Sequence, residues 1–332
     1  MPPNDPEART TSRPVPATTP DPGGGSGLLV AAVVVTVLAW ASAFVVIRAV
    51  GDRLTPGALT LGRLLVGTAA LTVLSAVPRL GGGHRLTALR RLSGRGRLLL
   101  VLVGVAWFGV YNVALNAGER HVDAGTASMI IQVGPILIAV LAGLVLREGF
   151  PAPLVIGAVV AFAGTVLIGV ATSSAPDGAR PAGASPALGV LLVLISALAY
   201  TVAMVAQKVV LRTVGGLVVT WAACAIGTVV CLPFAGQLVR GMRDAPASVW
   251  LSVLYLGLVP TAIAFSTWAY ALSRSDAGRL GITTYAVPPV AIGLGWLLLG
   301  EVPLPLAVLG GAISLVGVAL SRRRRPATPR VR

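Results

Sequence analysis

Residues 123–167 read DAGTASMIIQVGPILIAVLAGLVLREGFPAPLVIGAVVAFAGTVL, and residues 276–320 read DAGRLGITTYAVPPVAIGLGWLLLGEVPLPLAVLGGAISLVGVAL. A shift of 153 residues aligns the two stretches without a gap, and 12 of the 45 positions are identical. The identical positions include an Asp-Ala-Gly triplet, a proline, a glutamate and two glycines. Shared leucines are common in apolar sequence, but these residues in one register indicate an internal repeat.

A second alignment extends the repeat toward the N-terminus. It pairs residues 160 positions apart: Arg48 with Lys208, Gly67 with Gly227, Thr68 with Thr228, and the aromatic residues Trp40 and Tyr200. The repeat therefore involves most of the chain.

The composition is that of a membrane protein. Apolar residues make up 55% of the 332 residues and charged residues only 11%, and the mean hydropathy is +0.87. A soluble globular domain carries roughly 25% charged residues, so a water-soluble fold is excluded. Disorder is excluded outside the tails, because disordered segments have low hydrophobicity. We expect an all-α polytopic membrane protein.

Apolar runs of about 20 residues, long enough to cross a bilayer, alternate with segments rich in Pro, Gly or charge. Ten such runs lie near residues 28–50, 57–77, 97–117, 124–146, 152–171, 187–207, 215–236, 248–271, 279–299 and 304–321. We divide the chain into a disordered tail (1–27), a first five-helix repeat (28–171), a linker loop (172–186), a second repeat (187–321) and a basic tail (322–332).

The basic residues predict the orientation in the membrane. With the N-terminus in the cytoplasm, 19 of the 26 Lys and Arg residues fall on the cytoplasmic side and 6 outside. Basic residues concentrate in cytoplasmic loops, so we expect a plasma-membrane protein with both termini in the cytoplasm. Topology also accounts for the net charge of +15, and we expect no nucleic-acid partner.

Five spans in each repeat invert the second repeat relative to the first, because an odd number of crossings reverses the chain. Two similar halves of opposite orientation can exchange conformations around one site near the middle of the bilayer. The inverted-topology repeat therefore predicts a secondary transporter that moves a small-molecule substrate by alternating access.

Several motifs resemble the EamA-type proteins of the drug/metabolite transporter superfamily. Residues 39–45, AWASAFV, are similar to the Trp-Gly-Ser-x-Phe pattern near the start of that family, and residues 63–65, RLL, to its Arg-Phe-x pattern. The resemblance covers about residues 28–321 and continues through Tyr111-Asn112, both Asp-Ala-Gly triplets, Pro135, Pro288, Glu148 and Gly300-Glu301. Ala41 and Arg147 depart from it by replacing glycines. The resemblance implies ten helices and transport of amino acids, other metabolites or drugs, with export favoured.

Arg63 is the one basic residue placed well inside a predicted span, away from its ends. A guanidinium in hydrocarbon costs at least about 2.5 kcal/mol, so it requires a partner or a water-filled cavity. Arg63 lies about seven residues, or roughly 10 Å, from the outer end of its span, so its side chain could also extend to the interface. Binding of a substrate carboxylate and a purely structural anchor both stay open.

Pro135 and the pair Pro288-Pro289 are expected in the middle of the fourth and ninth spans, where proline interrupts helical hydrogen bonding. Backbone carbonyls near Gln132 and Tyr285 would then face polar groups, because lipid offers no hydrogen-bond donor. We expect Gln132 and Tyr285 to line a cavity between these spans, with the prolines as gating hinges. A kink that only improves packing is the alternative.

Aromatic and amide side chains of other spans complete the candidate cavity. Tyr111 and Asn112 lie in the third span and Trp268 in the eighth, while Trp40 and Tyr200 occupy matched positions in the first and sixth. Such a lining would hold an amino-acid-like or aromatic ligand by hydrogen bonds and stacking. Trp268 could equally lie in the aromatic belt at the membrane interface.

Glu148 and Glu301 recur at the ends of the fourth and ninth spans. We expect a structural role, in which each carboxylate accepts hydrogen bonds from backbone N–H groups of the following helix. None of the eleven acidic residues falls in the middle of a span, and both histidines lie in or beside loops. Facilitated transport or exchange is therefore at least as well supported as proton antiport.

Glycine pairs in the fifth and tenth spans suggest close helix packing. Gly157 and Gly164, like Gly310 and Gly317, are seven residues apart and lie on one helix face. We expect another helix to approach each face closely.

Other functions have less support in the sequence. It contains no catalytic motif, metal-ligand cluster or phosphate-binding loop, so we expect no enzyme activity, no cofactor and no bound metal. A channel or a membrane partner protein without transport activity is the alternative, and a homodimer stays open. A channel does not require inverted repeats, so the repeat favours a transporter.

Overall fold

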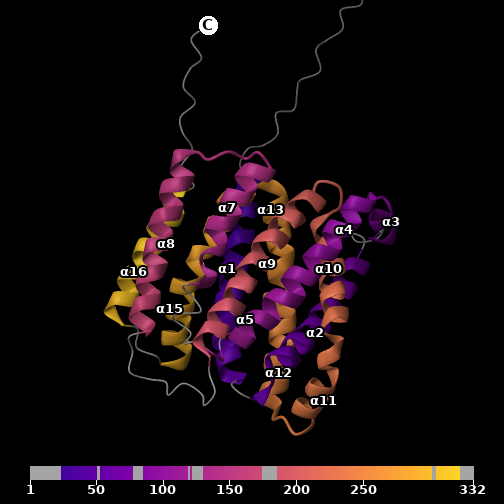
Figure 1. The fold of residues 1–332 in the computed structure, drawn as a ribbon. Coiled ribbons are helices and arrows are strands. Elements are labelled where there is room, and N and C mark those ends of the chain that lie inside the picture. Colours follow the sequence, from indigo (N-terminus) through magenta and orange to yellow (C-terminus); the bar gives the residue numbers. More distant parts are fainter. Residues whose placement is uncertain are drawn as a thin grey trace, which may run out of the picture.

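The computed structural model describes residues 24–50, 53–77, 85–118, 120–121, 130–173, 185–300 and 304–321, which form helices and short connections (Figure 1). The first half contains α1 (Gly24–Val50), α2 (Pro56–Ala76), α3 (Arg85–Arg90), α4 (Gly94–Val103), the π-helix η3 (Gly104–Tyr111), α5 (Asn112–Gly118), α7 (Gly134–Val145) and α8 (Ala152–Ser173). Glu301 and most of both predicted tails and of the predicted linker lie outside the described residues.

The second half repeats this order. It contains α9 (Pro186–Val210), α10 (Gly216–Cys231), the 3-10 turn η4 (Leu232–Phe234), α11 (Ala235–Arg243), α12 (Ala247–Gly257), the π-helix η5 (Leu258–Ile263), α13 (Ala264–Arg274), α14 (Ala277–Ile282), the 3-10 segment η6 (Thr283–Ala286), α15 (Val287–Leu299) and α16 (Pro305–Ser321).

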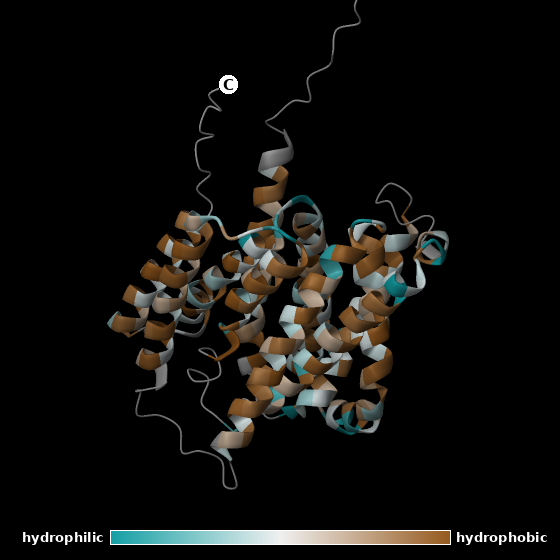
Figure 2. Cartoon of the chain, turned by 45° about the horizontal axis from the view of Figure 1, so that its top comes forward, coloured by the Kyte–Doolittle hydropathy of each residue, from teal (hydrophilic) through white to brown (hydrophobic). Residues whose placement is uncertain are grey.

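The described helices are those of a polytopic membrane protein. Eight helical stretches are long and apolar enough to cross a bilayer, and α7 and α16 are shorter apolar helices. These stretches overlap the ten predicted spans, whereas ten actual crossings stay a prediction. In Figure 2 apolar residues follow the lengths of the helices and polar residues gather near their ends.

Local sequence sets where α2 and α9 begin. The Thr55 hydroxyl accepts a hydrogen bond from the backbone N–H of Ala58 (3.3 Å), and the Ser185 hydroxyl accepts one from Leu188 (3.4 Å). A proline follows each capping residue. Proline is favoured at this position because the first helical N–H has no partner within the helix.

Helices α8 and α16 pack against each other in antiparallel directions, as an inverted repeat requires (Figure 1). Gly157 lies against Ser321 and Gly317 near one end, and Gly164 lies against Ser314 and Gly310 near the other. A Cβ atom added at Gly164 would lie 2.4 Å from the Ser314 nitrogen, so only glycine permits this approach. The glycine pairs of the two repeats therefore form one contact.

Equivalent residues of the two repeats also contact each other. The hydroxyls of Thr68 and Thr228 share a hydrogen bond of 2.8 Å, and these residues are 160 positions apart. The Tyr285 hydroxyl donates to the Gln132 carbonyl (2.8 Å), across 153 positions. Residues at equivalent positions of the two repeats contact each other where the pseudo-twofold axis that relates the repeats passes between them. The two sequence alignments thus describe a symmetry of the structure.

Pro288 and Pro289 lie in the middle of the helical stretch Ala277–Leu298, and the α-helix is interrupted just before them, as the sequence predicted; their role as hinges stays a prediction. Pro135 is the second residue of α7, and Pro288 and Pro289 are the second and third residues of α15. The short helix α14 and the segment η6 precede α15 in the same span. The regular helix therefore begins at each proline, where a missing donor costs nothing.

Candidate functional site

Seven aromatic side chains pack together in the middle of the bundle, and we call them the aromatic cluster: Trp40, Trp107, Phe108, Tyr111, Tyr200, Phe265 and Trp268. The ring centroids of Trp40 and Trp268 are 5.0 Å apart, and those of Trp107 and Tyr200 are 5.4 Å apart. Four elements, α1, η3, α9 and α13, supply the rings. These belong to the first and third predicted spans of each repeat, so both halves build the cluster.

The cluster brings together four residues that were predicted from the sequence: Trp40, Tyr111, Tyr200 and Trp268. Trp268 is 1% exposed, which excludes a position in the interfacial aromatic belt. Sequence reasoning did not single out Trp107 and Phe108, both fully or almost fully buried. The sequence did contain a signal for them, because three aromatic residues, Trp107, Phe108 and Tyr111, fall within the eight positions of η3.

Arg63 lies beside the aromatic cluster and is held by both repeats. Its Nε donates to the Thr261 hydroxyl (3.1 Å), and its Nη1 donates to the Asn112 side-chain oxygen (3.4 Å). Asn112 is four residues after Phe108, and Thr261 is four residues before Phe265, so the partners are one helical turn from the cluster. Arg63 is 8% exposed, so its side chain does not extend to the interface.

The two π-helices explain why these partners are available. A π-helix widens one turn and leaves backbone carbonyls without their usual partner. The Asn112 amide nitrogen donates to the carbonyls of Trp107 (2.9 Å) and Phe108 (3.2 Å). The Thr261 hydroxyl donates to the Leu256 carbonyl (2.7 Å), five residues earlier. Each side chain therefore donates a hydrogen bond to a backbone carbonyl of the adjoining π-helical turn and also accepts one from Arg63.

No carboxylate within the described part of the chain lies within 4.0 Å of Arg63. A guanidinium has five N–H donors, and its two side-chain hydrogen bonds leave the others for a further acceptor. The positive charge of Arg63 is therefore buried without a negative partner among the described residues. Such a group costs free energy unless an anion joins it.

Among the described residues, one side chain of the cluster and one side chain further along α9 have buried polar atoms without hydrogen-bond partners. They are the Trp268 indole nitrogen and both polar atoms of the Gln207 side chain. Gln207 is fully buried and follows Tyr200 by seven positions, so it lies on the same face of α9. Buried polar atoms normally have partners, so these atoms are exceptions to that rule. The described residues contain no group of three or more His, Cys, Asp or Glu side chains that could hold a metal.

Gln132 and Tyr285 contact each other, while their place in a cavity wall stays a prediction. The Tyr285 side chain is fully buried beside the ring of Phe162 in α8, and its hydroxyl donates to the backbone carbonyl of Gln132. The Ser314 hydroxyl in turn donates to the Tyr285 carbonyl (2.9 Å). The carbonyls near the prolines are thus satisfied within the protein, and this contact joins spans four and nine.

Glu148 caps a helix of the other repeat, which corrects the expectation that it caps the helix following it. Its two carboxylate oxygens accept hydrogen bonds from the backbone N–H groups of Ala277 (2.9 Å) and Gly278 (3.0 Å) at the start of α14. Helix N-termini favour negative charge. The matching residue Glu301 and the first Asp-Ala-Gly triplet lie outside the described residues.

Residues 26–170 and 187–323 each match the sequence model of the EamA-like transporter family. The chain belongs to the EamA-like transporter family. It is 37% identical over 304 residues to the "probable terminal-alkyne amino-acid exporter" of Streptantibioticus cattleyicolor, covering 90% of this chain and 96% of that protein. It is 32% identical over 282 residues to the uncharacterized transporter YdfC of Bacillus subtilis, covering 85% of this chain and 87% of that protein.

The fold of this EamA-like transporter also occurs in a solved structure. A crystal structure superposes with a TM-score of 0.70 and 20% identity, over 89% of this chain and 97% of that one. The family and the named relatives establish a multi-pass membrane transporter for small molecules, as the repeat had predicted.

Proposed function

We propose that this EamA-like transporter exports an amino-acid-like solute and that Arg63 binds the carboxylate of that solute. The relative from Streptantibioticus cattleyicolor is named as a probable amino-acid exporter, and the similarity covers nearly the whole of both chains. An amino-acid-like solute has an anionic group for Arg63 and a side chain that the aromatic cluster could contact. The proposal uses the two features that the described bundle places side by side.

The buried charge of Arg63 carries this proposal. Asn112 and Thr261 hold the guanidinium from opposite repeats and leave its remaining donors unused. Arginine binds carboxylates through two parallel hydrogen bonds, which fixes the orientation of the anion. Burial excludes water and so strengthens this interaction. A purely structural anchor would more readily have a carboxylate partner from the protein.

The same arrangement supports alternating access as the mechanism. Thr261 lies in the π-helix η5, and Asn112 directly follows the π-helix η3; the two π-helices are equivalent parts of the two repeats. A movement that exchanges the conformations of the repeats would change both contacts and alter the affinity of Arg63 for its anion. We propose ten membrane crossings with both termini in the cytoplasm, supported by the antiparallel packing of α8 and α16 and by the count of basic residues.

Solute exchange in proteoliposomes tests the function. Vesicles containing the purified protein are loaded with unlabelled amino acids, and entry of labelled amino acids is followed without an ion gradient. We expect uptake that the amino acid inhibits much more strongly than the corresponding amine, which lacks the carboxylate. Equal inhibition by the amine would contradict a role of Arg63 in carboxylate binding, and absence of exchange from a broad pool would contradict the substrate class.

Arg63→Lys provides the matched variant, because it keeps the charge and removes the planar pair of donors. We expect its KM to rise about tenfold or more, as expected for a lost charge-assisted hydrogen bond. Arg240→Lys is the control, since Arg240 is exposed on α11 and contacts none of the site residues named above. Equal transport by wild type and the Arg63→Lys protein would overturn the assignment.

A further inference from the structure

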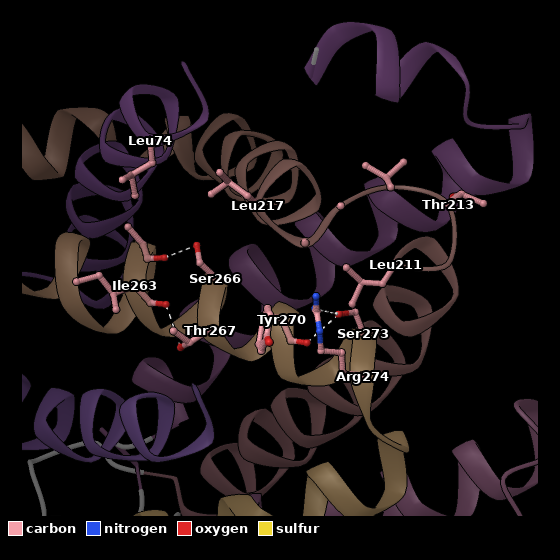
Figure 3. Close-up of a pocket in the computed structure, with 14 residues that line it drawn as sticks. Leu74, Leu211, Thr213, Leu217, Ile263, Ser266, Thr267, Tyr270, Ser273 and Arg274 are labelled. Carbon is pink, nitrogen blue, oxygen red and sulfur yellow. Dashed lines mark hydrogen bonds between the residues drawn. The ribbon is translucent and has the colours of Figure 1, made fainter. Parts of the chain in front are cut away.

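A separate groove of about 680 Å³ lies between α2, α10 and α13 (Figure 3). None of the residues predicted for the substrate site lines it. It extends along α13 from Ala262 and Ile263, at the end of η5, to Ser273 and Arg274 at the last turn. The loop that joins α9 to α10 closes its other side with Thr213.

The inner part of the groove is apolar. Leu74, Leu217, Ala262 and Ile263 contribute hydrocarbon side chains, and Ile263 is 44% exposed on the surface of the bundle. The groove is therefore open on a face that lipid would contact.

The hydroxyls in the wall are already bound to the helix backbone. Ser266 donates to the Ala262 carbonyl (2.6 Å), and Thr267 is within hydrogen-bond distance of the Ile263 carbonyl (3.1 Å), as Figure 3 shows. Thr267 also shares a hydrogen bond with the Thr36 hydroxyl (2.8 Å). This wall therefore offers mainly carbon surface, which suits a hydrocarbon chain better than a polar solute.

The mouth of the groove carries a positive charge. The guanidinium of Arg274 lies over the ring of Tyr270, 3.8 Å from its centroid, and donates to the Ser273 hydroxyl (3.1 Å). In the part of the chain described, no carboxylate lies within 4.0 Å of Arg274. Arg274 is exposed at the end of α13, so its remaining donors are accessible to an anion at the membrane surface.

We propose that this groove binds a phospholipid with an anionic head group. One acyl chain lies against Leu74, Leu217 and Ile263, and the phosphate meets Arg274. The order of the residues along the groove supports this occupant. The apolar residues lead to a cation at the end of α13, just as the acyl chains of a phospholipid lead to its phosphate. Basic pockets between membrane helices near the cytoplasmic surface bind anionic head groups by the same electrostatics.

Native mass spectrometry of the full-length protein tests the head-group preference. The purified protein is titrated with phosphatidylglycerol or phosphatidylcholine carrying identical acyl chains. We expect phosphatidylglycerol to bind about fivefold more tightly, the effect of one basic residue at a membrane surface. Arg274→Gln should abolish the preference, and the control Arg240→Gln at the opposite end of the bundle should retain it. A preference unchanged in Arg274→Gln would overturn the proposal.

The position of the acyl chain has its own tests. Phosphatidylglycerol with a photoreactive acyl chain should label wild-type peptides that contain Leu217 or Ile263, and this measurement needs no variant to fold. Ile263→Trp should fill the groove and reduce this labelling severalfold. Labelling spread evenly over the lipid-facing helices, or displacement of the lipid by amino acids at their transport KM, would overturn the proposal. The second result would assign the groove to the transported solute.

Discussion

Substitution of Gly164 by alanine tests the packing on which the two-repeat architecture depends. The added Cβ would lie 2.4 Å from the Ser314 nitrogen and 2.5 Å from the Gly310 oxygen. Both are backbone atoms, and carbon contacts are optimal at about 3.5 to 4.0 Å. Side-chain rotation cannot relieve such contacts, so α8 and α16 must separate by about 1 Å.

The expected loss of stability follows from two opposing terms. Overpacking costs up to about 3 kcal/mol when the neighbours cannot move. Alanine is favoured over glycine in a helix by about 1 kcal/mol, so the net loss is about 2 kcal/mol. A loss of this size lowers Tm by about 4 to 8 °C in a protein of a few hundred residues.

Thermal unfolding of the purified protein in detergent measures this change against a matched control. Gly293 in α15 is the control, because a Cβ atom there would meet nothing within 4 Å. Gly293→Ala should leave Tm unchanged or slightly raised. Gly317→Ala should resemble Gly164→Ala, because its Cβ would lie 2.2 Å from the Ala161 nitrogen. Equal Tm values for Gly164→Ala and Gly293→Ala would refute the close packing of α8 and α16.

Three further changes test individual contacts. Glu148→Gln replaces a carboxylate that accepts two backbone hydrogen bonds by an amide that can accept only one, and should destabilise the protein by about 1 to 3 kcal/mol in thermal unfolding. Tyr285→Phe leaves the Gln132 carbonyl unsatisfied and should cost a similar amount, with an unchanged Tm as the contradicting result. Thr261→Val removes one acceptor of Arg63 at nearly constant volume, and should alter the KM for amino-acid exchange in proteoliposomes more than it alters Tm. A lower Tm with an unchanged KM would indicate a structural role alone.

The sequence by itself determined the class of the protein, its two repeats and its family. Low charge and high hydropathy exclude a soluble fold, and the register shared by residues 123–167 and 276–320 is readable without coordinates. The family match over both halves and the transporter relatives confirm these conclusions. Patterns of this kind are encoded locally or by simple spacing, so the printed sequence is sufficient to detect them.

Several candidate residues could be named from the sequence, but not their partners. Arg63 stands out as a charge in an apolar run, and Trp40 and Tyr200 as matched aromatic residues. That Arg63 meets Asn112 and Thr261 depends on helices far apart in the chain and on two wide helical turns. No periodicity of the sequence reveals a π-helix, because the extra residue is accommodated by tertiary packing.

Tertiary structure also decided the roles of residues at helix ends. Glu148 binds the start of α14 rather than the start of α8, because the two repeats place those backbone donors nearer to it. The prolines stand where regular α-helix resumes within a span, at the starts of α7 and α15. Helix types and repeats follow from local pattern, whereas the pairing of charges, caps and rings depends on which distant segments the fold brings together.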